Sequence, residues 1–170
     1  MSWTDFYRRR DAIDAVLTYA ERHNGALGYH ALPEVRAVFT GEEELLLALH
    51  YKWNQILLGS VSTALLDAAQ DSRTDDCDAV IGGWRRAARA SPALRRLLDA
   101  HLEFSPAVRA AHDTQLRMLA TSAGLTRPGE ATAEVTRIGG AFLALAERTP
   151  AKAEPGRGGF ARLRRLAATA

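Results

Sequence analysis

Apolar residues recur along the chain at the three-to-four-residue spacing of amphipathic α-helices, and no segment keeps the period of two that a strand requires. Caps, glycines and prolines separate these periodic segments. Thr4 is a good N-cap for the first helix, and Gly25 ends it. Serine–proline pairs at Pro92 and Pro106 each place proline at the first position of a later helix. The pattern predicts an all-α fold of six or seven helices.

The longest predicted helix covers about residues 41–70 and is apolar around nearly its whole circumference. Thr40 and Glu43 have the spacing of a capping box at its start. A helix that is apolar on almost every side is normally enclosed by other helices. We therefore expect a bundle built around this central helix, with only a thin polar stripe left over, formed by Lys52, Gln55, Gly59 and Ser62.

The last predicted helix, about 130–148, contains two adjacent glycines, Gly139 and Gly140. Glycine lowers helix propensity by about 1 kcal/mol, but it lets another helix approach closely, including one from a second subunit. Residues 151–170 hold five basic residues and one acidic residue, while the whole chain has a net charge of +2. The sequence thus predicts a single helical domain over 1–150, close to neutral, and a flexible basic tail over 151–170.

The 170-residue length suits one domain, and a composition of 47% apolar and 25% charged residues is typical of globular proteins. The longest dense apolar run, Leu45–Leu49, is far shorter than the roughly 20 residues of a membrane-spanning helix. No secretory signal pattern is present at the start of the sequence. The single cysteine, Cys77, is surrounded by aspartates that disfavour its thiolate. We expect an unreactive thiol and a cytoplasmic location, with no membrane partner.

No sequence motif for a known catalytic chemistry is present. The chain lacks Glu-x-x-His and His-Glu-x-x-His metal patterns, glycine-rich phosphate loops and the Gly-x-Ser-x-Gly nucleophile turn. We therefore expect a protein that is not an enzyme and that uses no cofactor and no metal. An enzyme of unrecognised type, with His50 or His112 as its base, is the second alternative function.

The aromatic residues suggest a binding function instead. Trp53 and Trp84 fall on the two helices expected to be most central, and His50, His112 and Met118 are candidates to lie near them. A bundle interior lined by such residues can hold a small apolar or aromatic molecule. Ordinary core packing of the same side chains is the alternative.

Three segments resemble TetR-type transcriptional regulators. The stretch from Phe39 to Leu46 (Phe-Thr-Gly-Glu-Glu-Glu-Leu-Leu) resembles the segment that opens the fourth helix of that family. The first helix, ending at Gly25, is similar to the family's first helix, and Trp84 to Leu94 is similar to its variable ligand-binding half. The resemblance implies a ligand-binding and dimerisation domain, with two copies pairing through their C-terminal helices to form a homodimer.

The DNA-reading part of that family does not fit this sequence. A helix-turn-helix needs roughly 18 residues, whereas 13 residues separate Gly25 from Phe39. Glu42 also stands where the family carries a phosphate-contacting lysine. The resemblance therefore implies a shortened, non-functional helix-turn-helix and no DNA reading by the usual route. The first alternative is a DNA-binding regulator with a reduced reading head made of Arg8, Arg9, Arg10, Arg22 and Arg36.

Overall fold

The computed structural model describes residues 3–70 and 74–148, and within these ranges it contains seven helices and no strand. The all-α prediction is confirmed. The helices are α1 (Trp3–Arg22), α2 (Pro33–Arg36), α3 (Glu42–Ala68), α4 (Asp76–Ala90), α5 (Pro92–Ala100), α6 (Pro106–Ser122) and α7 (Thr132–Arg148). The predicted tail, 151–170, lies outside the described residues.

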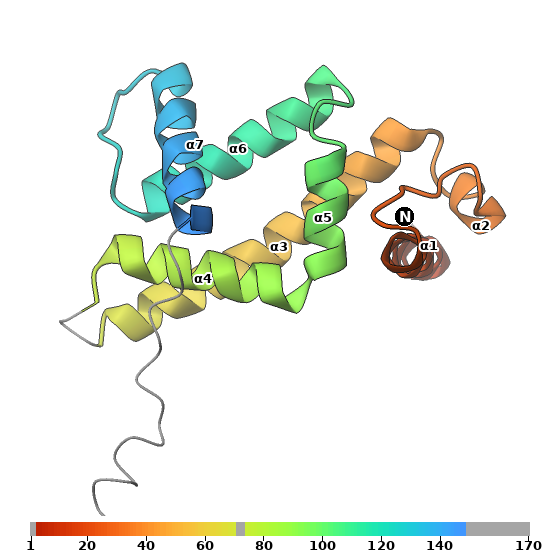
Figure 1. Cartoon of the computed structure of the whole chain (residues 1–170), viewed down its shortest axis with the longest axis horizontal. Helices are drawn as coiled ribbons and strands as arrows, with labels where there is room; N and C mark the ends of the chain where they lie inside the picture. Colours follow the sequence, from red (N-terminus) through yellow and green to blue (C-terminus); the bar gives the residue numbers. More distant parts are fainter. Residues whose placement is uncertain (1–2, 71–73, 149–170) are drawn as a thin grey trace, which may run out of the picture.

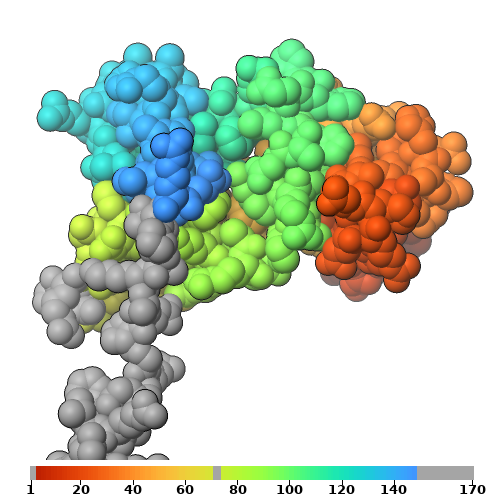
Figure 2. All heavy atoms as spheres, in the orientation of Figure 1, coloured from red at the N-terminus to blue at the C-terminus, as the bar shows by residue number. Residues whose placement is uncertain are grey.

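Helix α3 is the axis of the fold, as the sequence predicts. Helices α4, α5 and α6 all pack on it, α7 packs on α6, and α1 reaches α5 near the start of α3 (Figure 1). In the space-filling view, α5 lies between α1 on one side and α6 and α7 on the other (Figure 2). Trp53 and Leu57 of α3 are completely buried at the centre of this arrangement. No helix in the described ranges is both long and apolar enough to cross a membrane.

The enclosure of α3 is less complete than its apolar residues suggest. Tyr51, Leu58 and Leu66 are 67%, 47% and 67% exposed, on the same side of the helix as the exposed Gln55 and Ser62. The expectation that other helices cover all but a thin polar stripe was therefore wrong for this side. The physical reason is that α4, α5 and α6 pack on the other sides of α3 and no described helix covers this one.

The start of α3 is capped differently from the predicted capping box. The N-cap residue is Gly41, which has no side chain to donate or accept. Glu44, not Glu43, reaches back: its Oε2 accepts hydrogen bonds from the backbone N–H and the hydroxyl of Thr40, both at 2.9 Å. These bonds, together with the guanidinium of Arg9, lower the pKa of Glu44 to about 2.

Two glycines allow helices to cross in close contact. A Cβ at Gly83 of α4 would lie 2.7 Å from the Cα of Val61 in α3, and a Cβ at Gly139 of α7 would lie 2.1 Å from the carbonyl oxygen of Leu116 in α6. No side chain fits at either crossing. The close approach that Gly139 permits is therefore with α6 of the same chain.

The connection from α1 to α3 contains one helical turn. Between Arg22 and Glu42 the described residues form a single helix, α2, of four residues. The hydroxyl of Tyr29 donates to the carbonyl oxygen of Phe39 at 3.1 Å, which closes the loop against the start of α3. This agrees with the sequence argument that two helices of a reading head do not fit here.

Candidate functional site

Two helices face each other with matching pairs of polar residues, of which His112 is half-buried and the other three are buried. On α3, His50 and Trp53 are three residues apart, and on α6, His112 and Gln115 have the same spacing, so each pair shares one side of its helix. The indole N–H of Trp53 donates to Oε1 of Gln115 at 2.8 Å, and both side chains are buried. This bond joins the middle of α3 to the middle of α6.

Arg95 of α5 adds a positive charge to the same region. Its guanidinium lies 5.7 Å from the ring centre of Trp53 and 5.9 Å from that of Trp84 on α4. The Arg95 side chain is 12% exposed, and its Nη2 pairs with Asp99 at 2.6 Å and with Glu147 at 3.5 Å. Side chains from four helices therefore meet here; we call them the interior polar cluster, comprising His50, Trp53, Trp84, Arg95, His112 and Gln115.

Several buried polar atoms of the interior polar cluster lack a hydrogen-bond partner within the described part of the chain. They are both ring nitrogens of His50, Nε2 of Gln115 and Nε1 of Trp84. His50 is 2% exposed and Gln115 is 1% exposed. Each unsatisfied buried group costs about 1–3 kcal/mol, and native proteins contain few of them. Such a concentration at one place requires an explanation.

Both histidines of the cluster are held neutral at pH 7. Burial lowers the pKa of His50 to about 4, and the nearby His112 and Arg95 add to the effect. Burial, and next the charge of Arg95, lower the pKa of His112, while Asp113 raises it in part. A neutral imidazole offers one donor and one acceptor, so the two rings can hydrogen-bond either kind of group.

The structure brings together four of the five residues that the sequence suggested as ligand-binding. His50, Trp53, Trp84 and His112 belong to the interior polar cluster. Met118 lies three residues beyond Gln115 on α6, where its sulfur accepts from the hydroxyl of Ser122 at 3.7 Å, and it packs half-buried against the core.

Sequence reasoning missed Gln115 and Arg95. The spacing of Gln115 from His112 was the only signal for it, and that signal requires knowing that His112 faces inward. Arg95 looks like an ordinary surface arginine with an acid four residues later, since Asp99 follows it at that distance.

Some arginines of the DNA-binding alternative form ion pairs with acids of the same chain. Arg9 pairs with Glu44 at 2.8 Å, and Arg10 pairs with Asp11 at 2.8 Å. Arg9 also lies over the ring of Phe39, 4.5 Å from its centre. The remaining three, Arg8, Arg22 and Arg36, are exposed. Two of the five positive charges in this group are thus matched by acids within the protein.

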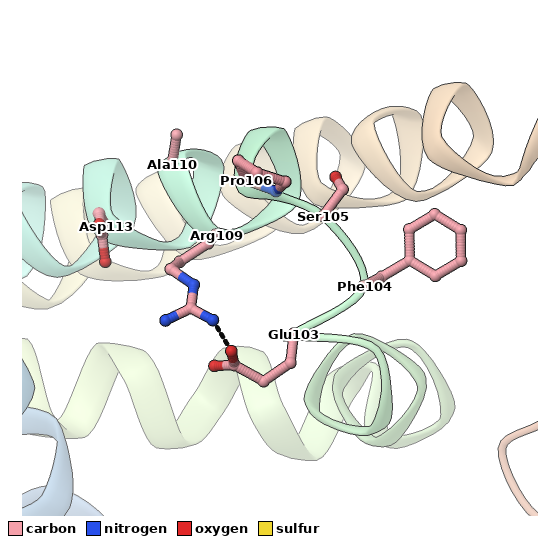
Figure 3. A pocket seen from close by; sticks show the side chains of 7 residues that line it. All are labelled: Glu103, Phe104, Ser105, Pro106, Arg109, Ala110 and Asp113. Atoms are coloured by element: carbon pink, nitrogen blue, oxygen red, sulfur yellow. Dashed lines mark ion pairs between the residues drawn. The ribbon is translucent and has the colours of Figure 1, made fainter.

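A surface hollow of about 350 Å³ lies where α5 connects to α6. In Figure 3, Arg109 extends toward Glu103, with which it forms an ion pair, and Phe104 points away from both. Both charged side chains are more than half exposed. Because the hollow is open to solvent and its main charges neutralise each other, it is a weaker candidate than the interior polar cluster.

No group of three or more histidine, cysteine, aspartate or glutamate side chains within residues 3–70 and 74–148 could hold a metal ion.

Comparison with known protein families, curated proteins and solved structures finds no match to this chain.

Proposed function

We propose that this chain is a non-enzymatic, ligand-binding helical domain that resembles the ligand-binding and dimerisation half of a TetR-type regulator. Its ligand is a small molecule with a large apolar surface, held between α3, α4, α5 and α6. The observation that carries the proposal is His50, which is 2% exposed and has no partner for either ring nitrogen among the described residues.

The chemistry of the interior polar cluster supports this proposal. The rings of Trp53 and Trp84 offer flat apolar faces, and His50 and Gln115 offer a few polar atoms beside them. A site that is mostly apolar, with a small number of well-placed polar groups, is typical of pockets for small organic molecules. A ligand that bonds these polar atoms would remove the cost of leaving them unpaired.

The proposal includes pairing of two copies through α6 and α7, as the resemblance implies. Ala141 and Leu145 lie four residues apart on an exposed side of α7, and Leu145 is 58% exposed. DNA reading is not part of the proposal, because α2 is a single turn and Arg9 and Arg10 are paired with acids.

Binding of neutral aromatic probes tests the ligand-binding function. Indole and 2-naphthol, added to the full chain, should raise the melting temperature and change tryptophan fluorescence with a saturable dependence on concentration. Gln115→Leu should weaken probe binding at least 10-fold, while Gln55→Leu, a matched change on the exposed side of α3, should leave it unchanged. Probes that neither stabilise the chain nor saturate a fluorescence change would contradict the proposal, and so would equal effects of the two variants.

A further inference from the structure

We infer that the ligand of the interior polar cluster is an aromatic carboxylate, whose carboxylate is recognised by Arg95 and the neighbouring unpaired donors. This inference rests on the proposed ligand-binding function and specifies the chemistry of the molecule that the site takes.

The unpaired polar atoms of the cluster are mainly donors. The indole N–H of Trp53 can only donate, so it fixes the oxygen of Gln115 as its acceptor and leaves the NH₂ group of Gln115 as an unpaired donor. The Nε1 of Trp84 can likewise only donate. His50 can supply a donor from either ring nitrogen. A molecule that satisfies these atoms must therefore contribute acceptors, and a carboxylate supplies two oxygens with about four acceptor sites.

Arg95 supplies the site with a cationic hydrogen-bond donor, which already pairs with two acids. Arg95 keeps its charge at any physiological pH, and its guanidinium lies against the rings of Trp53 and Trp84 in the interior. Its two acidic partners, Asp99 and Glu147, have side chains 49% and 47% exposed, so they occupy the solvent side. The ion pairs with both acids are made by Nη2, and a guanidinium carries further N–H groups that can bind a carboxylate. Arginine binds carboxylates well through two such N–H groups at once.

The two histidines make the binding of an anion depend on pH. A carboxylate next to His50 and His112 would favour their protonated forms. The other charged groups that act on this pair are Arg95, which opposes protonation of both rings, and Asp113, which favours protonation of His112. Asp99 and Glu147 act on this region through their ion pairs with Arg95. Binding of a carboxylate should therefore take up protons and strengthen as the pH falls from 7.5 to 6, whereas binding of a neutral molecule should not strengthen.

Two probes of the same shape but different charge test whether the carboxylate group itself is recognised. Naphthalene-2-carboxylate and naphthalene-2-carboxamide should be titrated into the full chain by calorimetry at pH 7, with indole as a third, neutral probe. We expect the carboxylate to bind at least 10-fold tighter than the amide. In buffers of different ionisation enthalpy, proton uptake should accompany the carboxylate alone.

Variants of two neighbouring arginines test which residue causes the preference for the carboxylate probe. Arg95→Met should remove the preference for the carboxylate while leaving binding of the amide within about threefold, and Arg96→Met, an exposed neighbour, should leave both unchanged. If Arg95→Met does not fold, proton uptake by the unmodified chain decides the question. Equal or tighter binding of the amide would overturn the carboxylate inference and leave the proposed function standing. Failure of all three probes to bind would overturn both.

Discussion

Replacing Gly139 by alanine tests the closest helix contact of the fold. The added Cβ would lie 2.1 Å from the carbonyl oxygen of Leu116 and 2.5 Å from its carbonyl carbon, while ordinary contact begins near 3.4 Å. The backbone of α6 would have to withdraw by about 1.3 Å. Because the obstacle is backbone and not the end of a flexible side chain, α6 and α7 must move apart along their contact.

The expected loss of stability follows from two opposing effects. Overpacking of a close-packed interior costs about 1–3 kcal/mol, and alanine in place of glycine gains up to about 1 kcal/mol in helix propensity. At Gly140 the same substitution would place a Cβ 3.8 Å from Cδ1 of Leu116, an ordinary contact. Gly139→Ala should therefore be destabilising and Gly140→Ala neutral or stabilising. Because both gain the same helix propensity, the difference between them should equal the overpacking cost, about 1–3 kcal/mol.

Urea denaturation followed by circular dichroism measures this difference, with the neighbouring glycine as the internal control. For a chain of this size each kcal/mol corresponds to about 2–4 °C in melting temperature. A second pair gives the same comparison at the crossing of α4 with α3, where Gly83 is blocked by the backbone of Val61 and Gly82 faces open space. Equal stability of the two variants within a pair would refute the close-contact reasoning at that crossing.

Acid should destabilise the protein through His50: its folded pKa, about 4, is below the unfolded value of about 6.5. The unfolded chain thus binds more protons between these two pH values. The free energy of unfolding should therefore fall by on the order of 3 kcal/mol from pH 6.5 toward pH 4, and His50→Leu should show a smaller fall over the same range. Leu145→Glu on α7 should convert the proposed dimer to a monomer in light scattering, whereas Leu66→Glu on the exposed side of α3 should leave the dimer intact. A monomer with Leu66→Glu alone would show that the dimer interface lies on α3. Burial, reinforced by three neighbouring aspartates, raises the pKa of Cys77, and its thiol donates to the carbonyl oxygen of Ala123 at 3.3 Å. It should react with a disulfide reagent at least 10-fold more slowly in the folded chain than after unfolding.

Periodicity predicts the helices well because each helix buries one side, so its apolar residues recur at helical spacing within the segment itself. The serine–proline starts at Pro92 and Pro106 coincide with the first residues of α5 and α6. Of the two serines, only Ser105 caps its helix through its side chain: its hydroxyl oxygen accepts a hydrogen bond from the N–H of Val108 at 3.2 Å. Periodicity does not report which side remains open: the exposed side of α3 carries Leu58 and Leu66, which are indistinguishable in the sequence from core leucines.

Four of the six residues of the interior polar cluster could be suggested from the sequence, and the other two were missed for a different reason. Tryptophan and histidine attract attention wherever they fall on an apolar helix, so Trp53 and His50 could be suggested from residue type alone. Arg95 and Gln115 are common surface residues, and their burial depends on how α5 and α6 cross α3. That crossing is a long-range property, set partly by the glycine contacts of α4 and α7, and no local pattern encodes it.

The interior polar cluster occupies the place where apolar side chains would stabilise the bundle most. Leucine at position 50 or 115 would bury more apolar surface and leave no unpaired polar atoms, so a sequence that maximised stability would carry it there. His50 and Gln115 instead have unsatisfied atoms beside the cation of Arg95, at the junction of four helices. Departures from otherwise consistent packing tend to mark functional sites.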